Sequence, residues 1–332
     1  MPSETPPRRL SEFAMIAKLF APLASNAKGA YGLADDAASL NVPAGEELVV
    51  TVDTVVESVH FLADDLADDI AKKALRVNLS DLAAKGARPI GYLLALSLPD
   101  WVDDAWLEKF AAGLKEDQKR YRIDLLGGDT TSTPGPLTIS ITALGSVTAG
   151  RTLRRAGAQP GDIVFVSGTI GDAGAGLALL SGPKANLSAN ARQTLITRYR
   201  LPEPRSDLGP MLVGTATASL DVSDGLLADL AHIADVSGVR IVLDAGLIPL
   251  SEAYFSFAGS SVSAIIDAAT SGDDYEIAFT APPSAREAIA AAAGSVGVPV
   301  TEIGRVEEGN GVVLLDANGK PIPVDRPGYV HF

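Results

Sequence analysis

Residues 47–56 read ELVVTVDTVV, a run rich in β-branched residues. This composition predicts a strand that delivers Asp53 to its tip. A helix is predicted next, from Asp68 to about Lys85, and Gly86 is expected to end it. The apolar residues of this helix lie on one broad face: Ile70, Ala74, Leu75, Leu79 and Leu82. Asp81 falls one position from that face, so its carboxylate can point inward beside the apolar stripe.

The patterns on both sides of this segment indicate a mixed fold in two domains. Strand and helix patterns alternate without a strict βαβ repeat, which favours an α+β first half over a Rossmann sheet. Residues 148–162, TAGRTLRRAGAQPGD, combine turn residues with arginines and predict a domain boundary. The expected domains are residues 1–149 and residues 150–332, the second of α/β type. Further strands are expected at 92–98, just before 127, and at 137–147, 163–166, 218–222 and 240–244, and further helices at 103–121, 173–180, 224–236 and 284–293.

Composition limits the partners and the location. The 332-residue chain has a formal net charge of −14, which argues against nucleic acid or an anionic membrane as a partner. It contains no cysteine, which excludes disulfides, thiolate metal sites and thiol nucleophiles. The N-terminus lacks the apolar core of a signal peptide, and no apolar run reaches the roughly 20 residues that span a bilayer. We therefore expect a cytoplasmic protein.

Aspartates recur at predicted strand ends and helix starts, mostly among small residues that leave room for an anion or a hydrated cation. Carboxylates gathered in one place repel each other and raise each other's pKa values unless cations neutralise them. Mg²⁺ prefers such oxygen ligands, and in enzymes it commonly carries nucleotide phosphates. The pattern therefore indicates an enzyme of phosphoryl chemistry. The aspartates are Asp35, Asp36, Asp53, Asp81, Asp129, Asp221, Asp224, Asp273 and Asp274.

Three local motifs have both a structural and a functional interpretation. The turn from Gly168 to Gly176 would either hold phosphate on a helix N-terminus or simply connect a strand to a helix, and the chain has no Walker sequence. Asp224 alone is typical of a helix N-cap, but Asp221 supplies a second carboxylate that capping does not use. Gly127-Gly128-Asp129 is more specific, because paired glycines let backbone N–H groups approach phosphate while the aspartate holds a metal.

Two cationic features of the sequence also have both a structural interpretation and a ligand-binding one. His60 follows the Asp53 strand and is either structural or a contact for a substrate phosphate. Arg151, Arg154 and Arg155 are either a solvated charge run or a clamp for triphosphate oxygens, because the guanidinium fork matches phosphate geometry. Because the chain is so acidic, we expect it to bind an anionic substrate through a few basic side chains of this kind as well as through metal ions.

Taken in order, seven segments of the chain resemble thiamine-monophosphate kinases. They are LADDA (33–37), VDTVVESVHF (52–61), KALRVNLSDLAAKGA (73–87), GGDTT (127–131), LDVSDGL (220–226), SGDDYE (271–276) and GYVHF (328–332). No single segment is decisive, but the ordered set is highly specific, and the resemblance covers the chain from about Ser11 to Phe332.

The resemblance implies a reaction and a fold. The reaction is ATP-dependent phosphorylation of thiamine phosphate to thiamine diphosphate. The fold is that of aminoimidazole ribotide synthetase, in which an N-terminal domain binds ATP and Mg²⁺ and forms a β-barrel with its copy across a homodimer. A C-terminal α/β domain would cover the active site.

The resemblance also implies the site residues, motif by motif. For Mg²⁺ they are Asp36, Thr51, Asp53, Asp81, Asp129, Asp221 and Asp224; for ATP they are Gly128, Asp129, Arg155 and Ser223; and for thiamine phosphate they are His60, Asp273 and Tyr329. Several Mg²⁺ ions are expected, and a requirement for a monovalent cation stays open. No residue is assigned as a general base, because the acceptor phosphate is already largely dianionic at neutral pH.

Three positions depart from the family pattern: Ala34 replaces a usual glycine, Val52 a common threonine and Asp273 a typical glutamate. Loss of the hydroxyl at Val52 is expected to remove one metal contact, and the side chain of Asp273 is shorter than that of the typical glutamate. Selenophosphate synthetase and the hydrogenase-maturation protein of this superfamily normally need a reactive cysteine or selenocysteine, which this chain lacks. Aminoimidazole ribotide synthetase and a catalytically silent binding protein stay open as alternatives.

Overall fold

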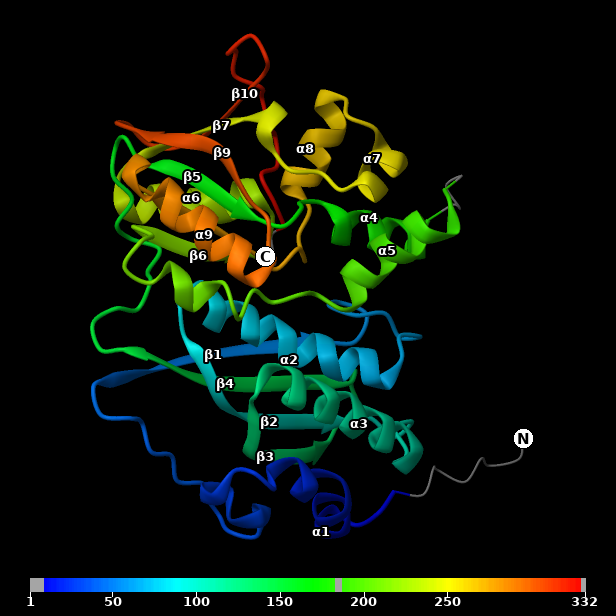
Figure 1. Cartoon of the computed structure of the whole chain (residues 1–332). Helices are drawn as coiled ribbons and strands as arrows, with labels where there is room; N and C mark the ends of the chain where they lie inside the picture. Colours follow the sequence, from blue (N-terminus) through cyan, green and yellow to red (C-terminus); the bar gives the residue numbers. More distant parts are fainter. Residues whose placement is uncertain (1–8, 183–186, 330–332) are drawn as a thin grey trace. The chain divides into compact units, whose positions relative to one another are not determined.

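The computed structural model describes residues 9–182 and 187–329 (Figure 1). The chain forms two compact units, each with its own sheet. The first unit comprises Met1–Leu82 and Arg88–Ala149, and the second comprises Ala83–Ala87 and Gly150–Phe332. The roles that the sequence assigns to residues 1–149 and 150–332 stay predictions.

The first unit is built on a mixed sheet with the strand order β1-β4-β2-β3. β1 (Glu46–Val56) and β2 (Arg88–Leu98) both pair antiparallel with β4 (Thr138–Thr148). β2 and β3 (Asp124–Ser132) run parallel, and α3 (Asp104–Tyr121) makes the crossover that parallel pairing requires. This mixed pairing confirms the expected α+β character of the first half.

Two helices cover one face of this sheet (Figure 1). They are α2 (Ala67–Ala84) and α3, and Arg76 of α2 pairs with Asp117 of α3 while both side chains are buried. The pair is bidentate, with Nε to Oδ2 at 2.6 Å and Nη2 to Oδ1 at 2.9 Å. Two buried charges that satisfy each other in this way fix the relative position of the two helices.

The other face of β1 carries apolar side chains that stay exposed in this unit. Leu48, Val50 and Val52 are 39%, 55% and 60% exposed. Because strand side chains alternate between faces, Thr51 and Asp53 lie on the opposite face from Val52. Val52 therefore does not share a face with Asp53. The expectation that its missing hydroxyl removes one metal contact stays a prediction.

The second unit has a sheet in the order β10-β7-β9-β5-β8-β6. Neighbouring strands are antiparallel except for the parallel pair of β10 and β7. The strands are β5 (Ile163–Ser167), β6 (Ala218–Val222), β7 (Arg240–Asp244), β8 (Glu276–Ala281), β9 (Val300–Glu307) and β10 (Gly311–Leu315). The helices of this unit are α4 (Asp172–Ser181), α5 (Ala189–Arg200), α6 (Leu226–Ser237), α7 (Glu252–Ala258), α8 (Val262–Thr270) and α9 (Arg286–Val296).

Both faces of this second sheet are buried, because helices cover each of them (Figure 1). Val164 and Val166 of β5 belong to a core shared with α4, α6 and α8. Ile163 and Phe165 point the other way, into a core shared with α9, where Phe165 stacks on Phe279 with ring centroids 5.1 Å apart. A strand that is buried on both faces has a continuous run of apolar residues. For this reason the sequence predicts β5 clearly.

One helix start differs from its prediction. The helix after β6 begins at Leu226 rather than Asp224, and its N-cap residue is Gly225, whose φ is 124° and which makes no side-chain cap. Asp224 is therefore not the capping residue. Of the helices that the structure describes, none is long and apolar enough to cross a membrane.

Candidate active site

The first acidic group joins β1 to α2. Thr51 Oγ1 donates a hydrogen bond to Asp81 Oδ2, and the backbone N–H of Asp53 donates to Asn78 Oδ1 at 3.1 Å. Burial, and then the negative charge of Asp81, raise the pKa of Asp53 to about 7. Both effects disfavour the ionised carboxylate, so a bound cation would relieve the desolvation as well as the repulsion.

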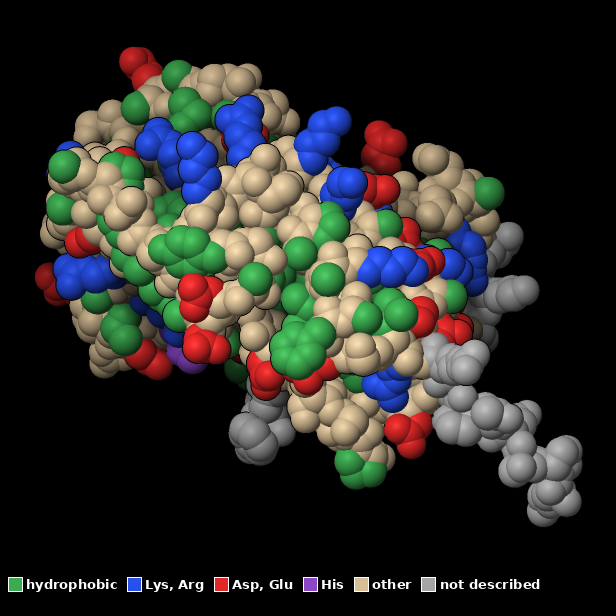
Figure 2. All heavy atoms as spheres, turned by 90° about the horizontal axis from the view of Figure 1, so that it is seen from below, with side chains coloured by type: hydrophobic (Ala, Val, Ile, Leu, Met, Phe, Trp, Pro, Cys, Tyr) green, Lys and Arg blue, Asp and Glu red, His purple; other side chains and the backbone are tan. Residues whose placement is uncertain are grey.

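The second acidic group faces a cavity of about 1140 Å³ inside the first unit. Asp36, on the irregular segment after the turn at Lys28–Leu33, lines this cavity together with Gly128 and Asp129 of β3. Thr51, Asp53 and Asp81 are not among the residues that line it. Apolar side chains also line the cavity, among them those of Phe13, Phe20, Leu93 and Leu144. A space-filling view shows exposed apolar side chains close to acidic ones on one face of the molecule (Figure 2).

Gly128 is required at its position because β2 runs directly beside it. A Cβ on Gly128 would overlap with the carbonyl oxygen of Leu94, its partner in the β2–β3 register, whereas a Cβ on Gly127 would reach Leu93 Cδ2 at an ordinary 3.4 Å. β3 can thus lie this close to β2 at Gly128 only while the residue is glycine.

The two glycines therefore predict unequal losses of stability. Gly128→Ala is expected to lower the free energy of unfolding by about 2 to 3 kcal/mol, because β3 must shift away from β2. Gly127→Ala, the matched control, is expected to lower it by less than about 1 kcal/mol. Urea denaturation followed by circular dichroism measures both, and equal losses for the two variants would show that the close approach does not matter.

In the second unit, the loop from β6 to α6 is held by a buried carboxylate. Asp229 Oδ2 accepts the backbone N–H groups of Ser223, Asp224 and Gly225 at 3.0, 3.0 and 3.1 Å. Burial, and then the charge of Asp224, raise the pKa of Asp229 to about 7. The N–H groups at the start of α6 are therefore occupied, so Ser223 and Asp224 would meet a ligand through their side chains. Asp221 is largely buried on β6 itself.

Backbone hydrogen bonds bring three distant segments of the second unit together. The N–H of Asp273 donates to the Ser223 carbonyl at 2.8 Å, and the N–H of Tyr329 donates to the Asp224 carbonyl at 2.9 Å. Four predicted site residues, Ser223, Asp224, Asp273 and Tyr329, thus lie in one place. The remainder of the terminal motif, Val330 to Phe332, lies outside the described residues.

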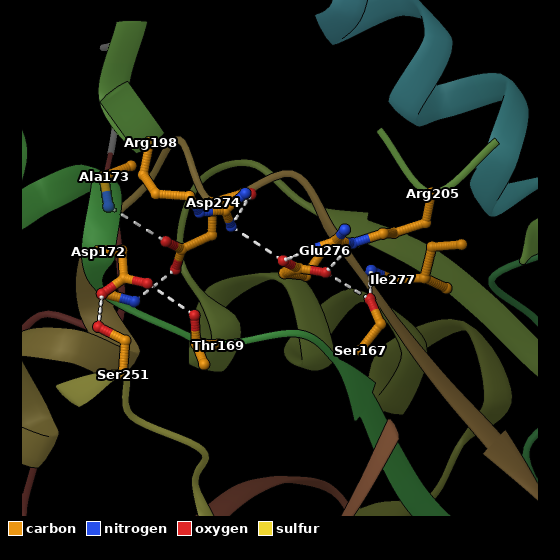
Figure 3. Close-up of polar contacts among 11 residues, drawn as sticks. Ser167, Thr169, Asp172, Ala173, Arg198, Arg205, Ser251, Asp274, Glu276 and Ile277 are labelled. Carbon is orange, nitrogen blue, oxygen red and sulfur yellow. Dashed lines mark hydrogen bonds and ion pairs between the residues drawn. The ribbon is translucent and has the colours of Figure 1, made fainter. Parts of the chain in front are cut away.

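In the glycine-rich turn before α4, two N–H groups are occupied within the protein, which favours the structural interpretation of this turn over phosphate contact. The buried carboxylate of Asp274 accepts the N–H of Gly171 at 2.7 Å and that of Ala173 at 3.5 Å (Figure 3). Burial raises the pKa of Asp274 well above its usual value, while the Gly171 bond opposes this. Next to it, the fully buried Glu276 pairs with Arg198 and Arg205 (Figure 3).

The remaining predicted residues are His60 and the arginines. His60 Nδ1 accepts the backbone N–H of Val56 at 3.1 Å, so this nitrogen carries no proton in that bond. Arg151, Arg154 and Arg155 are exposed, and the carbonyl of Arg155 accepts from Ser237 Oγ at 3.5 Å. The structure therefore places these arginine side chains at the surface of the second unit.

The predicted metal ligands are divided between the units. Asp36, Thr51, Asp53, Asp81 and Asp129 belong to the first unit, and Asp221 and Asp224 belong to the second. Among the residues described, no three histidine or acidic side chains form a ready metal cluster. The donor set nevertheless fits Mg²⁺, because it consists of hard oxygen ligands and one of them, the half-buried Asp53, has a pKa raised by desolvation and by the charge of Asp81.

Several residues of this region had no sequence prediction. Asp229, Arg198 and Arg205 were not singled out, and Glu276 and Asp274 appeared only as members of a motif. Asp229 follows Gly225 by four residues, so one turn of helix brings its carboxylate back over the helix start. Nothing in the sequence marks Arg198 and Arg205, because only the fold brings them to Glu276.

Comparison with known proteins shows the family to which the chain belongs. The model of the AIR synthase related protein, N-terminal domain, matches residues 34–147, and that of the C-terminal domain matches residues 159–316. The chain is 44% identical to the thiamine-monophosphate kinase of Caulobacter vibrioides, over 99% of this chain and 92% of that protein. It is 42% identical to that of Escherichia coli K12, over 97% and 98% of the two chains. The chain belongs to the thiamine-monophosphate kinase family.

Solved structures agree with this membership. The thiamine-monophosphate kinase of Stenotrophomonas maltophilia K279a has a TM-score of 0.83 and 42% identity, and the match covers 94% of this chain and 98% of that one. AaThiL complexed with AMPPCP and TMP has a TM-score of 0.77 and 33% identity, with coverage of 98% and 99%. The hydrogenase maturation protein HypE of E. coli has a TM-score of 0.78 at 22% identity, which shows a shared fold only.

Proposed function

We propose that this chain phosphorylates thiamine phosphate to thiamine diphosphate with ATP. The observation that carries the proposal is the likeness to AaThiL, because that protein was solved with an ATP analogue and TMP together, and the match covers 98% of this chain. The family's motifs are present here in order, with their aspartates intact.

The ligands are assigned to residues as follows. ATP is held by Gly128, Asp129, Arg155 and Ser223, and thiamine phosphate by His60, Asp273 and Tyr329. Several Mg²⁺ ions are held by Asp36, Thr51, Asp53, Asp81, Asp129, Asp221 and Asp224. The raised pKa of Asp53 supports a cation beside β1, and the shared cavity of Asp36, Gly128 and Asp129 supports a phosphate-bearing ligand beside β3.

The transfer is direct and in line. An oxygen of the acceptor phosphate forms a bond to the γ-phosphorus of ATP while the bond from that phosphorus to the β–γ bridging oxygen breaks, and ADP leaves. Bound Mg²⁺ supplies neutralisation of the anionic reactants. The aspartates orient the phosphates, and no side chain has to remove a proton because the acceptor is already ionised. Trapping a phosphorylated form of the protein with labelled ATP alone would contradict this step.

A homodimer that closes the β1 face into a barrel belongs to the same proposal. Its support is the exposed apolar strip of Leu48, Val50 and Val52 on β1 and of Leu93 on β2, because large exposed apolar patches mark interfaces. Sedimentation equilibrium tests it: the chain should be dimeric, and Val50→Asp should make it monomeric.

The substrate is tested by measuring ADP release with ATP and Mg²⁺ in the presence of different acceptors. Thiamine phosphate is expected to support turnover, whereas thiamine and aminoimidazole precursors serve as controls for the rival functions. Turnover with an aminoimidazole precursor would instead favour a ribotide synthetase. Mg²⁺-dependent ATP binding without any turnover would favour a silent binding protein.

A further inference from the structure

Asn78 is a fully buried amide side chain of α2 that reaches across to β1. Both ends of the amide are bonded. Oδ1 accepts the backbone N–H of Asp53 at 3.1 Å, and Nδ2 donates to the Ala74 carbonyl at 3.0 Å. Burying an amide is costly unless its polar atoms find partners, and here one partner belongs to another element. Asn78 therefore fixes the backbone of β1 at Asp53 against α2.

A second hydrogen bond joins the same two elements next to the first. Thr51 precedes Asp53 by two residues on β1, and Asp81 follows Asn78 by three residues on α2, so each pair shares one face of its element. Thr51 Oγ1 donates to Asp81 Oδ2. The two bonds together determine how the strand and the helix lie beside each other at this point.

This arrangement brings two like charges together. The negative charge of Asp81 acts on the carboxylate of Asp53, whose ionised form burial already disfavours. Repulsion between the two carboxylates would move β1 away from α2 unless other contacts opposed it. The bond to Asn78 opposes it through the main chain of Asp53 and does not use the Asp53 carboxylate. The fold thus holds an acidic pair in a position that a cation would favour.

We propose that Asn78 is a positioning residue that holds the Asp53 carboxylate beside that of Asp81, so that the pair binds a divalent cation. This inference rests on the assignment of both aspartates to Mg²⁺ in the proposed function. Asn78 acts through Asp53 and touches neither the cation nor the reacting atoms. Residues that orient metal ligands from behind in this way commonly control the affinity for the metal.

The test is Asn78→Leu, which keeps the approximate shape of the side chain and removes the amide. Mn²⁺ is the probe, because carboxylates bind it as they bind Mg²⁺, and electron paramagnetic resonance measures the free ion without any substrate. Asp53→Asn first identifies the bound Mn²⁺ that depends on the acidic pair. The Kd of that ion is expected to rise about tenfold or more in Asn78→Leu, the loss typical of a residue that orients a ligand.

Gln118→Met is the matched control, because Gln118 is also a buried amide of this unit and donates to the Leu23 carbonyl at 2.9 Å. Both variants should lower Tm in EDTA, since each loses a buried hydrogen bond. Gln118→Met should keep the Kd for Mn²⁺ within about twofold, because Gln118 belongs to α3 and not to the contact of α2 with β1. If Asn78→Leu does not fold, Asn78→Ala removes the same amide and replaces it in the test.

A double mutant shows whether Asn78 acts through Asp53. If it does, Asp53→Asn with Asn78→Leu should bind Mn²⁺ no more weakly than Asp53→Asn alone. The inference is overturned by an unchanged Kd in Asn78→Leu, by a further loss in the double mutant, or by wild-type Mn²⁺ binding that does not depend on Asp53. Failure of the proposed function is seen separately, as an absence of turnover with thiamine phosphate in protein that still binds Mn²⁺.

Discussion

Replacing Asp53 with asparagine is expected to lower kcat/KM for thiamine phosphate at least about 100-fold while stabilising the metal-free protein. The loss of activity follows because a metal ligand contributes several kcal/mol to the transition state, and each 1.4 kcal/mol is a factor of ten. The gain in stability follows because burial and Asp81 disfavour the charged form of Asp53. An asparagine avoids this penalty, so the free energy of unfolding should rise by about 1 kcal/mol, allowing for solvent screening.

The pH of the measurement matters for Asp53. Because the pKa of this carboxyl is raised from 3.8 to about 7 on folding, the penalty is absent below about pH 4 and complete above about pH 7. Urea denaturation in EDTA at pH 8 therefore shows the full difference. Asp64→Asn, an exposed aspartate in the same unit, is the matched control and should change neither property. A destabilised or fully active Asp53→Asn protein would contradict the assignment.

Replacing Glu276 with glutamine is expected to lower the free energy of unfolding by about 3 to 5 kcal/mol. Glu276 is fully buried and accepts from Arg198 Nη2 at 2.9 Å, Arg205 Nε at 2.6 Å and Ser167 Oγ at 2.6 Å. Removing its charge takes this counter-charge away from the two largely buried guanidinium groups. The measurement is urea denaturation of the wild type and the variant.

The control for Glu276 is an ion pair of similar geometry at the surface. Arg286 pairs with Glu302 through Nε at 2.7 Å and Nη2 at 3.0 Å, but both side chains are exposed. Glu302→Gln is therefore expected to change the free energy of unfolding by less than about 1 kcal/mol. If the two variants lose equal stability, burial is not what makes Glu276 matter.

The sequence predicted elements best where periodicity and stop signals agree. The strand at β1 and the helix at α2 were predicted within two residues of their observed bounds, because alternation, an apolar stripe and Gly86 point to the same structure. The strands β8, β9 and β10 and the helices α5, α7 and α8 were not predicted, since their patterns are short or broken. The ordered motifs predicted the family, and the comparisons confirmed it.

The candidate site was less accessible to sequence reasoning. From the sequence, aspartates were assigned as ligands or helix caps by the residues next to them. A carboxylate from further along the chain can also cap a helix. Asp229 accepts N–H groups at the start of α6, where the sequence predicted Asp224 as the cap. Asp274 accepts an N–H group at the start of α4, where the sequence left phosphate binding open. Tertiary contacts decide which buried carboxylate reaches which N–H group. These contacts cannot be predicted from a single sequence by local patterns.

The measurement that tests the central claim most directly is the fate of the label from γ-³²P-ATP incubated with the wild-type protein, Mg²⁺ and thiamine phosphate. The account predicts that the label appears in the terminal phosphoryl group of thiamine diphosphate, one for each ADP formed, and that EDTA abolishes the transfer. Label that appears only in inorganic phosphate, or that stays on the protein, would contradict it.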